Sequence, residues 1–166
     1  MIGVRQSQSH LEKHVAFKRW LYKGGRPNTL GKIINRGWAW LHSSGLLPDY
    51  MITLEVEGRQ SGKVISFPLA LTVLKGERYL VSMLGEDVNW VRNVHAASGK
   101  AQLRHGRTEQ VQLEEVEVSQ RAPILKAYLK IAPGARPHIP VDNNASVSEF
   151  EKIAVQYPVF RIRKNN

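Results

Sequence analysis

Residues 51–74, MITLEVEGRQSGKVISFPLALTVL, contain two stretches of alternating apolar and polar side chains, separated by a glycine-containing turn. Apolar residues take every second position in residues 52–56, between threonine and glutamate. They do so again in residues 65–73, the longest clean alternation in the chain, and we expect one apolar face there. Because successive side chains of a strand point to opposite faces, this period of two predicts two half-buried strands joined through residues 58–63.

More strands are predicted towards the C-terminus. Lys75-Gly76-Glu77 predicts a tight hairpin turn into a third strand at residues 79–83. Residues 157–163 predict a last short strand, with proline near its start, where a missing N–H does least harm.

A second hairpin is predicted from residues 101–105 and 108–118, turning at Gly106. In its second arm the apolar phase shifts between Leu113 and Val116, which indicates a bulge. Bends of this kind help a sheet close into a barrel.

Helical patterns separate the strands. Asp87 is placed to cap a short helix that Gly99 ends, and Ser119 is placed to open a second one. Residues 133–144, rich in proline, glycine and asparagine, predict an irregular loop, and Ser146 to Glu149 has the capping-box pattern. Helices between clusters of hairpins indicate an α+β protein with a mainly antiparallel sheet.

The N-terminal part of the chain differs in charge. Residues 1–50 hold eight basic residues against two acidic ones, and the whole chain has a formal charge of +10. Their apolar spacing predicts two amphipathic helices, so we expect a helical arm at residues 1–47 and a β-barrel at residues 48–166, within one globular domain. A basic electrostatic field favours nucleic acid, anionic lipid headgroups or a multiply charged cofactor as partners, but the charge alone is better explained by a solvated basic face that keeps the protein soluble.

Composition excludes several classes. The chain has 166 residues and no cysteine, which excludes disulfides and thiolate catalysis. No run approaches the roughly 20 apolar residues that span a bilayer, and residues 1–20 carry charges throughout, so we expect a cytoplasmic protein. His10 and His14 have helical spacing without a third ligand, so no metal site is expected. No nucleic-acid-binding module is visible.

The turn at residues 58–63 is the first candidate site. Gly58 and Gly62 allow backbone N–H groups to converge as a nest for an anion, while Arg59 and Lys63 supply charge and Ser61 a hydroxyl donor. An ordinary hairpin turn with solvated basic residues is the structural alternative.

The second candidate is the short helix around Asn89. Trp90 and Asn93 are three residues apart and share a face, so the indole could stack on a flat ring while the amide bonds its edge. The alternative is a core Trp90 and a solvent-facing Asn93.

At these residues the chain resembles the deazaflavin-dependent nitroreductase and quinone-reductase family of actinobacteria, whose cofactor is coenzyme F-420. The matching stretches, in order, are GRQSGK at 58–63, FPL at 67–69, GERY at 76–79, NWVRN at 89–93, APGARPHIPV at 132–141 and YPVFRI at 157–162. The resemblance implies a split β-barrel like that of FMN-binding pyridoxamine oxidases, with the cofactor along a basic groove.

The resemblance also implies site residues. The phosphate-binding turn corresponds to Arg59, Gln60, Ser61, Gly62 and Lys63, the supporting strand residue to Pro68, and the ring contacts to Trp90, Asn93, Ser82 and Met83. Gln60 stands where many members have lysine, and Val64-Ile65 where they often have Pro-Arg. Nitroreductase members of the family have a tyrosine-rich C-terminal stretch that shapes the substrate pocket. This chain has the loop at 133–141 instead, so the resemblance does not imply activity on nitroimidazoles.

These observations predict an F-420H2-dependent oxidoreductase that passes a hydride to an apolar acceptor such as a quinone or an unsaturated lipid. His138 and Tyr157 are candidate proton donors, and their alternative roles are loop polarity and core packing. The alternatives are a non-redox fatty-acid- or lipid-binding protein and, less favoured, an FMN enzyme on the same barrel. A homodimer is expected, and the N-terminal helices suit either an anionic membrane surface or packing over one barrel mouth.

Overall fold

The computed structural model describes residues 50–164, so the predicted N-terminal arm at 1–47, including His10 and His14, lies outside the described residues. The described elements are β1 (Met51–Glu57), β2 (Val64–Leu74), β3 (Glu77–Val81), α3 (Asn89–Ala96), β4 (Lys100–His105), β5 (Arg107–Glu115), α4 (Val118–Ile131), the 3-10 helix η2 (Pro133–His138), α5 (Val147–Glu151), the 3-10 helix η3 (Ala154–Gln156) and β6 (Val159–Lys164). Within this part of the chain no helix is long and apolar enough to cross a membrane.

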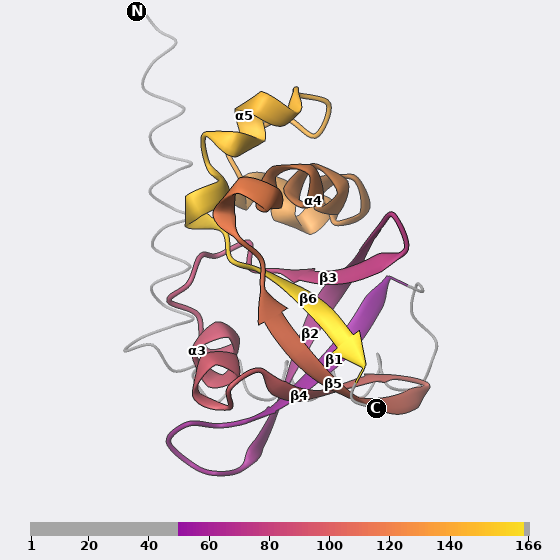
Figure 1. The fold of residues 1–166 in the computed structure, drawn as a ribbon, viewed down its shortest axis with the longest axis vertical. Helices are drawn as coiled ribbons and strands as arrows, with labels where there is room; N and C mark the ends of the chain where they lie inside the picture. The colour runs from indigo at the N-terminus through magenta and orange to yellow at the C-terminus, as the bar shows by residue number, and fades with distance from the viewer. Residues whose placement is uncertain (1–49, 165–166) are drawn as a thin grey trace, which may run out of the picture. The chain divides into compact units, whose positions relative to one another are not determined.

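The strands form a closed barrel in the order β1-β2-β3-β6-β5-β4, with every neighbouring pair antiparallel (Figure 1). Leu54 on β1 lies opposite Phe67 on β2 and opposite Leu103 on β4, so β1 closes the ring. Helices α4 and α5 lie together at one end of the barrel, away from α3 (Figure 1). The predicted α+β class and the antiparallel barrel are confirmed.

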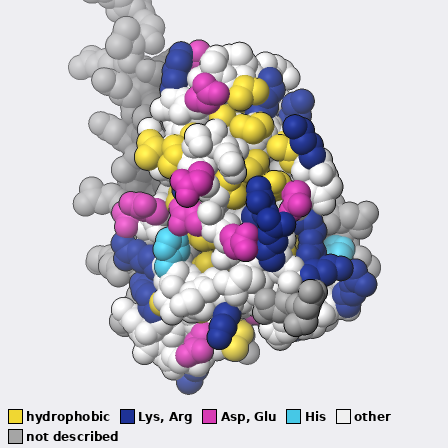
Figure 2. All heavy atoms as spheres, in the orientation of Figure 1, with side chains coloured by type: hydrophobic (Ala, Val, Ile, Leu, Met, Phe, Trp, Pro, Cys, Tyr) yellow, Lys and Arg dark blue, Asp and Glu magenta, His cyan; other side chains and the backbone are white. Residues whose placement is uncertain are grey.

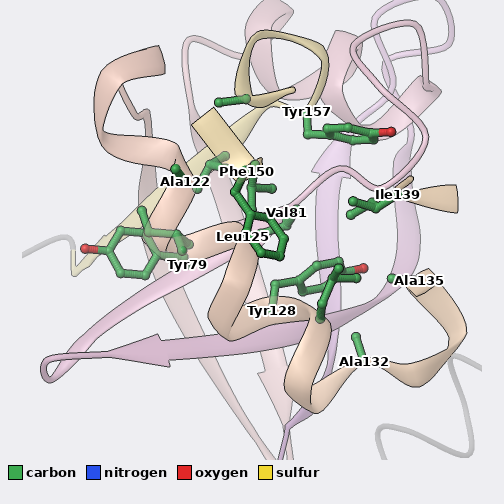
Figure 3. Packing of buried hydrophobic residues seen from close by; sticks show 14 of the residues in the cluster. Tyr79, Val81, Ala122, Leu125, Tyr128, Ala132, Ala135, Ile139, Phe150 and Tyr157 are labelled. Carbon is green, nitrogen blue, oxygen red and sulfur yellow. The ribbon is translucent and has the colours of Figure 1, made fainter. Parts of the chain in front are cut away.

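Two clusters of buried side chains form the core. The inner cluster fills the barrel and contacts α3; its members are Ile52, Leu54, Val56, Leu80, Trp90, Val91, Val94, Ala101, Leu103, Val111, Leu113, Phe160 and Ile162. The outer cluster lies between the barrel and α4, α5, η2 and η3 (Figure 3). On β3, Leu80 belongs to the inner cluster while Tyr79 and Val81 belong to the outer one, so both faces of this strand are buried.

Strand β2 departs from its predicted one-sided pattern. Its middle residues 67, 69 and 71 pack against the inner cluster as expected, but Ile65 and Val73 are exposed, by 37% and 59%. On the opposite face Ala70 and Leu74 pack against the outer cluster. The alternate residues 65–73 do share one face, as the pairing of β2 with β1 and β3 shows, but the barrel interior covers only the middle of that face in this 11-residue strand.

The prediction of a bulge in β5 is wrong. Pairing between β5 and β6 runs without a break from Val111 opposite Lys164 to Glu115 opposite Phe160, and Val116 N–H donates to the Val159 carbonyl at 2.8 Å. The apolar phase changes because Leu113 faces the inner cluster and Val116 faces the outer one. A change of covered face, not an inserted residue, explains the sequence pattern.

Helix starts differ from the predicted caps. Val88 is the N-cap of α3, while Asp87 forms an ion pair with Arg92 instead of capping. Glu117 precedes α4, so Ser119 lies inside its first turn. Helix α5 does begin after Ser146, but without the hydrogen bond of a capping box: the Ser146 hydroxyl contacts the hydroxyl of Ser148. The first half of the predicted loop at 133–144 is the 3-10 helix η2.

The predicted turns are confirmed by their backbone angles. Lys75 and Gly76 both have positive φ, 52° and 79°, which fits a tight hairpin between β2 and β3. Gly106 turns the β4–β5 hairpin with a φ of 68°. Gly99 ends the segment after α3 with a φ of 80°, and its N–H donates to the Val94 carbonyl at 2.8 Å.

We predict that Gly99→Ala is far more destabilising than Gly76→Ala. The two glycines have nearly the same φ, 80° and 79°. A Cβ at Gly99 would lie 2.3 Å from the Leu113 carbonyl oxygen, whereas nothing lies within 4 Å of one at Gly76. In urea unfolding, Gly76→Ala should cost about 1 kcal/mol from the positive φ alone, and Gly99→Ala at least about 2 kcal/mol more. Equal losses in the two variants would contradict the close approach of β5 to Gly99.

Candidate functional site

The β1–β2 turn at residues 58–63 lies against helix α3. The Arg59 guanidinium donates from Nη1 to Asn93 Oδ1 at 2.8 Å, and Arg59 N–H donates to the same oxygen at 3.4 Å. Nη1 and Nη2 are each 3.4 Å from Asn89 Oδ1. The two candidate stretches predicted separately from the sequence therefore meet in one place.

The turn carries two positive charges that pair with no carboxylate of the described residues. Arg59 and Lys63 are both exposed, and neither forms an ion pair with a carboxylate among residues 50–164. Glu57, on the last position of β1, is exposed and likewise has no ion pair with either cation. An anion approaching this turn meets uncompensated charge and donors suited to phosphate.

The predicted backbone nest is not formed. Gly58 N–H donates to the Lys63 carbonyl at 2.9 Å, and the N–H groups of Ser61 and Gly62 donate to the Gly58 carbonyl at 3.0 and 2.8 Å. Lys63 N–H donates to the Ser61 hydroxyl at 3.3 Å. The turn uses these donors to close on itself, so side chains would have to hold an anion here. Gly62, with a φ of 63°, serves the geometry of the turn.

Asn93 is buried rather than solvent-facing, with 1% of its surface exposed. While its Oδ1 accepts from Arg59, its Nδ2 is buried and has no hydrogen-bond partner in the described part of the chain. A buried amide donor without an acceptor is costly, and an external acceptor would satisfy it.

Trp90 occupies the barrel core. It is 7% exposed, and its ring meets Phe160 edge to face at 5.4 Å between centroids. This is the core-packing alternative raised from the sequence, and it anchors α3 on the inner cluster.

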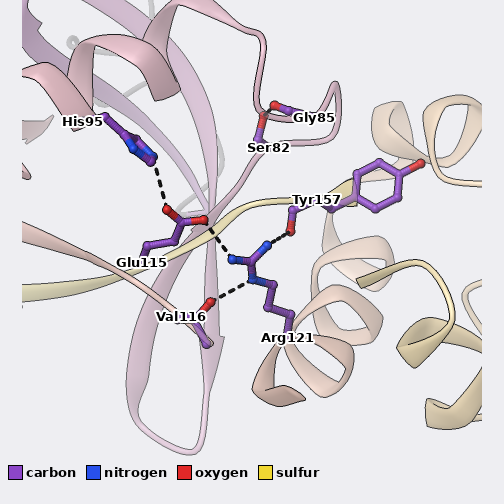
Figure 4. Close-up of polar contacts among 7 residues, drawn as sticks. All are labelled: Ser82, Gly85, His95, Glu115, Val116, Arg121 and Tyr157. Atoms are coloured by element: carbon purple, nitrogen blue, oxygen red, sulfur yellow. Dashed lines mark hydrogen bonds and ion pairs between the residues drawn. The ribbon is translucent and has the colours of Figure 1, made fainter. Parts of the chain in front are cut away.

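The other residues implied by the resemblance are dispersed. Pro68 lies on β2 opposite Thr53, and Gln60 is exposed on the turn. Ser82 is buried and donates to the Gly85 carbonyl at 2.5 Å, in the connection from β3 to α3 (Figure 4). Met83 is half-buried against the outer cluster. Their contacts to a cofactor remain predictions.

Sequence reasoning missed a polar network that fixes α3 to the barrel. His95 Nε2 lies 3.2 Å from Glu115 Oε2, and the other oxygen of that carboxylate accepts from Arg121 Nη2 at 2.8 Å (Figure 4). Arg121, which is 6% exposed, also donates to the carbonyls of Val116 and Tyr157, at 2.8 and 3.5 Å. Nothing in the spacing of these residues signals the network, because His95 on α3 and Arg121 on α4 reach Glu115 on β5 only once the three elements are packed together.

His138 and Tyr157 do come together, but through the main chain. The Tyr157 hydroxyl donates to the His138 carbonyl at 2.9 Å, within the outer cluster (Figure 3). Burial raises the pKa of Tyr157 above 10.0. A general acid works best with a pKa near the operating pH, so this environment does not favour proton donation by Tyr157. Among the described residues, no group of three or more His, Asp or Glu side chains could hold a metal ion.

No family model matches the sequence, and no curated protein is detectably similar to it. Among solved structures, a domain-swapped dimer superposes with a TM-score of 0.51 at 18% identity, covering 80% of this chain and 95% of its own. A protein of Bacteroides thetaiotaomicron, provisionally described as a 5-nitroimidazole antibiotic resistance protein, gives 0.51 at 9% identity, covering 76% and 80%. An F420-H2 dependent reductase gives 0.44 at 21% identity, covering 70% and 96%.

The reductase superposition is too loose to bear on the cofactor, and all three identities are low enough that the likeness concerns the fold alone. Together with the closed antiparallel barrel and its flanking helices, this likeness shows that the chain has a split β-barrel fold.

We predict that Tyr157→Phe lowers the free energy of unfolding by about 1 kcal/mol, the net value of one hydrogen bond. Tyr50→Phe, at an exposed tyrosine, is the control and should change stability little. Because the folded-state pKa of Tyr157 is raised, its contribution is fully present below pH 10 and is lost as the pH rises through the folded-state value. Unfolding curves across alkaline pH test this. A Tyr157→Phe loss no larger than that of the control would contradict a structural hydroxyl.

Proposed function

We propose that this protein is an F-420H2-dependent oxidoreductase that binds the phosphate end of the cofactor at the turn of residues 58–63. The observation that carries the proposal is the contact between this turn and α3 through Arg59 and Asn93. Arg59 and Lys63 are exposed there, and neither pairs with a carboxylate among the described residues. The split β-barrel fold is compatible with a flavin-type cofactor, although fold alone does not determine function.

The described residues fit the phosphate end of such a cofactor. Arg59 offers a guanidinium fork and Lys63 a mobile ammonium group, both suited to phosphate oxygens. Asn93 Nδ2 is a buried donor that lacks an acceptor in the described part of the chain, and it belongs to the side chain that holds Arg59. When bound, the deazaflavin supplies hydride-transfer chemistry, and the protein contributes binding, orientation and exclusion of water.

The proposed acceptor is apolar, such as a quinone or an unsaturated lipid. Val64 and Ile65, exposed by 69% and 37%, directly follow Lys63 on the same hairpin, so an exposed apolar side chain adjoins the charged turn on each face of β2. The same observation favours the second candidate function, a non-redox lipid-binding protein on this barrel. Redox turnover distinguishes the two.

We also propose that the protein is a cytoplasmic homodimer and that its predicted N-terminal helices contact an anionic membrane surface. The dimer is supported by one solved structure of similar fold, which is a domain-swapped dimer. FMN is the less favoured cofactor, and the visible absorbance of the purified protein separates it from F-420.

The test is a titration of the purified protein with F-420, followed by cofactor fluorescence. Wild type should bind at micromolar concentration or below, and Arg59→Ala/Lys63→Ala should bind at least tenfold more weakly, since charge-assisted hydrogen bonds contribute about 1.5–3 kcal/mol each. The matched control is Arg107→Ala/Lys130→Ala, which removes one exposed arginine and one exposed lysine elsewhere and should bind like wild type.

Failure of wild type to bind F-420 at any practical concentration would contradict the proposal and turn the search to lipids. Equal weakening in the control variant would mean that total charge, not this turn, determines binding.

A further inference from the structure

Arg59 differs from the other arginines that side chains hold in place. Within residues 50–164, six arginines contact at least one carboxylate; these are Arg78, Arg92, Arg104, Arg121, Arg161 and Arg163. Basic and acidic side chains accordingly intermingle on the face shown in Figure 2. The side-chain acceptors of Arg59 are instead the amide oxygens of Asn89 and Asn93.

An amide and a carboxylate have different effects on a guanidinium. Both accept its hydrogen bonds and fix its orientation, but a carboxylate at such a distance also cancels its charge. The amide oxygen of Asn93, 2.8 Å from Arg59 Nη1, fixes the fork and leaves the positive charge intact. A guanidinium held in this way is oriented in advance and still attracts an anion.

The residues behind Asn93 make this support rigid. Asn93 is 1% exposed, and its oxygen also accepts the Arg59 backbone N–H, so one amide holds both ends of the residue. Helix α3 is itself fixed by the Trp90–Phe160 ring contact and by the contact of His95 Nε2 with the Glu115 carboxylate at 3.2 Å. A side chain ordered before binding loses less conformational entropy when the ligand arrives.

We propose that Asn93 is a positioning residue, assisted by Asn89, that orients Arg59 with its charge uncompensated for a phosphate group of the bound ligand. This inference rests on the proposed function, because it assigns the phosphate to the turn of residues 58–63. This role explains why the acceptor at position 93 is an amide, although a carboxylate would orient the arginine equally well. Asparagine provides the acceptor without the competing charge.

The experiment replaces amide by carboxylate with almost no change of shape. Asn93→Asp and Asn89→Asp are compared with wild type, Arg59→Ala and Asn144→Asp, a control that adds the same charge at an exposed position before α5. Binding of inorganic pyrophosphate and of F-420 is measured by calorimetry at low and high salt. Asn89 is only half-buried, so Asn89→Asp decides the matter if the buried Asn93→Asp variant does not fold.

Each aspartate at α3 should weaken pyrophosphate binding at least tenfold at low salt, with Asn144→Asp within twofold of wild type. The loss should shrink at 0.5 M salt, since screening weakens exposed charge interactions, whereas a purely structural defect would not respond to salt. Asn89→Ala, which removes the acceptor without adding charge, should lose only about twofold to threefold in affinity, because a long hydrogen bond to a neutral amide contributes little.

The contrary outcomes are separable. If Arg59→Ala loses binding while both aspartate variants stay within twofold of wild type, the role of Asn93 is wrong and the proposed phosphate site stands. If wild type and Arg59→Ala bind pyrophosphate and F-420 equally, or neither binds, the proposed site and this inference are both wrong.

Discussion

Closure of the barrel by β1 is the constraint on which the rest of the structure depends. This strand pairs along its whole length with β2, and through Thr53, Leu54 and Glu55 it pairs with β4. Neither β2 nor β4 is therefore left as an open sheet edge on the side of β1. Leu54, at 0% exposure, lies at the centre of the inner cluster that closure creates. Because α3 packs on that cluster through Trp90 and Val94, closure also determines where the helix meets the β1–β2 turn.

Polar groups near the outer cluster and polar groups at the candidate site have different surroundings. The outer cluster is covered by α4, α5, η2 and η3, and at its edge the Tyr157 hydroxyl donates to the His138 carbonyl. Arg121 joins α4 to Glu115 on the barrel, where the charges are paired. The opposite situation holds at the β1–β2 turn, where Arg59 is ordered by neutral groups. Charge there is kept available, which is the physical basis for assigning a ligand to that place.

Local features of the fold could be predicted from the sequence, and distant contacts could not. Alternation located all six strands of the described region, and Gly76, Gly99 and Gly106 marked turns whose backbone angles require glycine or tolerate little else. The burial of both faces of β3, and the change of face between Leu113 and Val116, depend on where the helices pack. A period of two cannot report a second covered face, so an expected bulge proved to be regular pairing.

The same limit applies to the site. Glycines and cations drew attention to residues 58–63, but the backbone donors expected to bind an anion are used within the turn. The contact between Arg59 and Asn93 spans 34 positions and has no signature in local sequence. The family resemblance implied a separate role for each residue, phosphate binding for Arg59 and ring contact for Asn93. Their direct hydrogen bond is visible only once the chain is folded.

The most direct test of the account is a crystal structure of the protein grown with F-420. The account predicts a cofactor phosphate within hydrogen-bonding distance of the Arg59 guanidinium and of Lys63, with Asn93 still accepting from Arg59. A cofactor bound elsewhere on the barrel, or an Arg59 side chain turned away from Asn93 while the phosphate is bound, would contradict it.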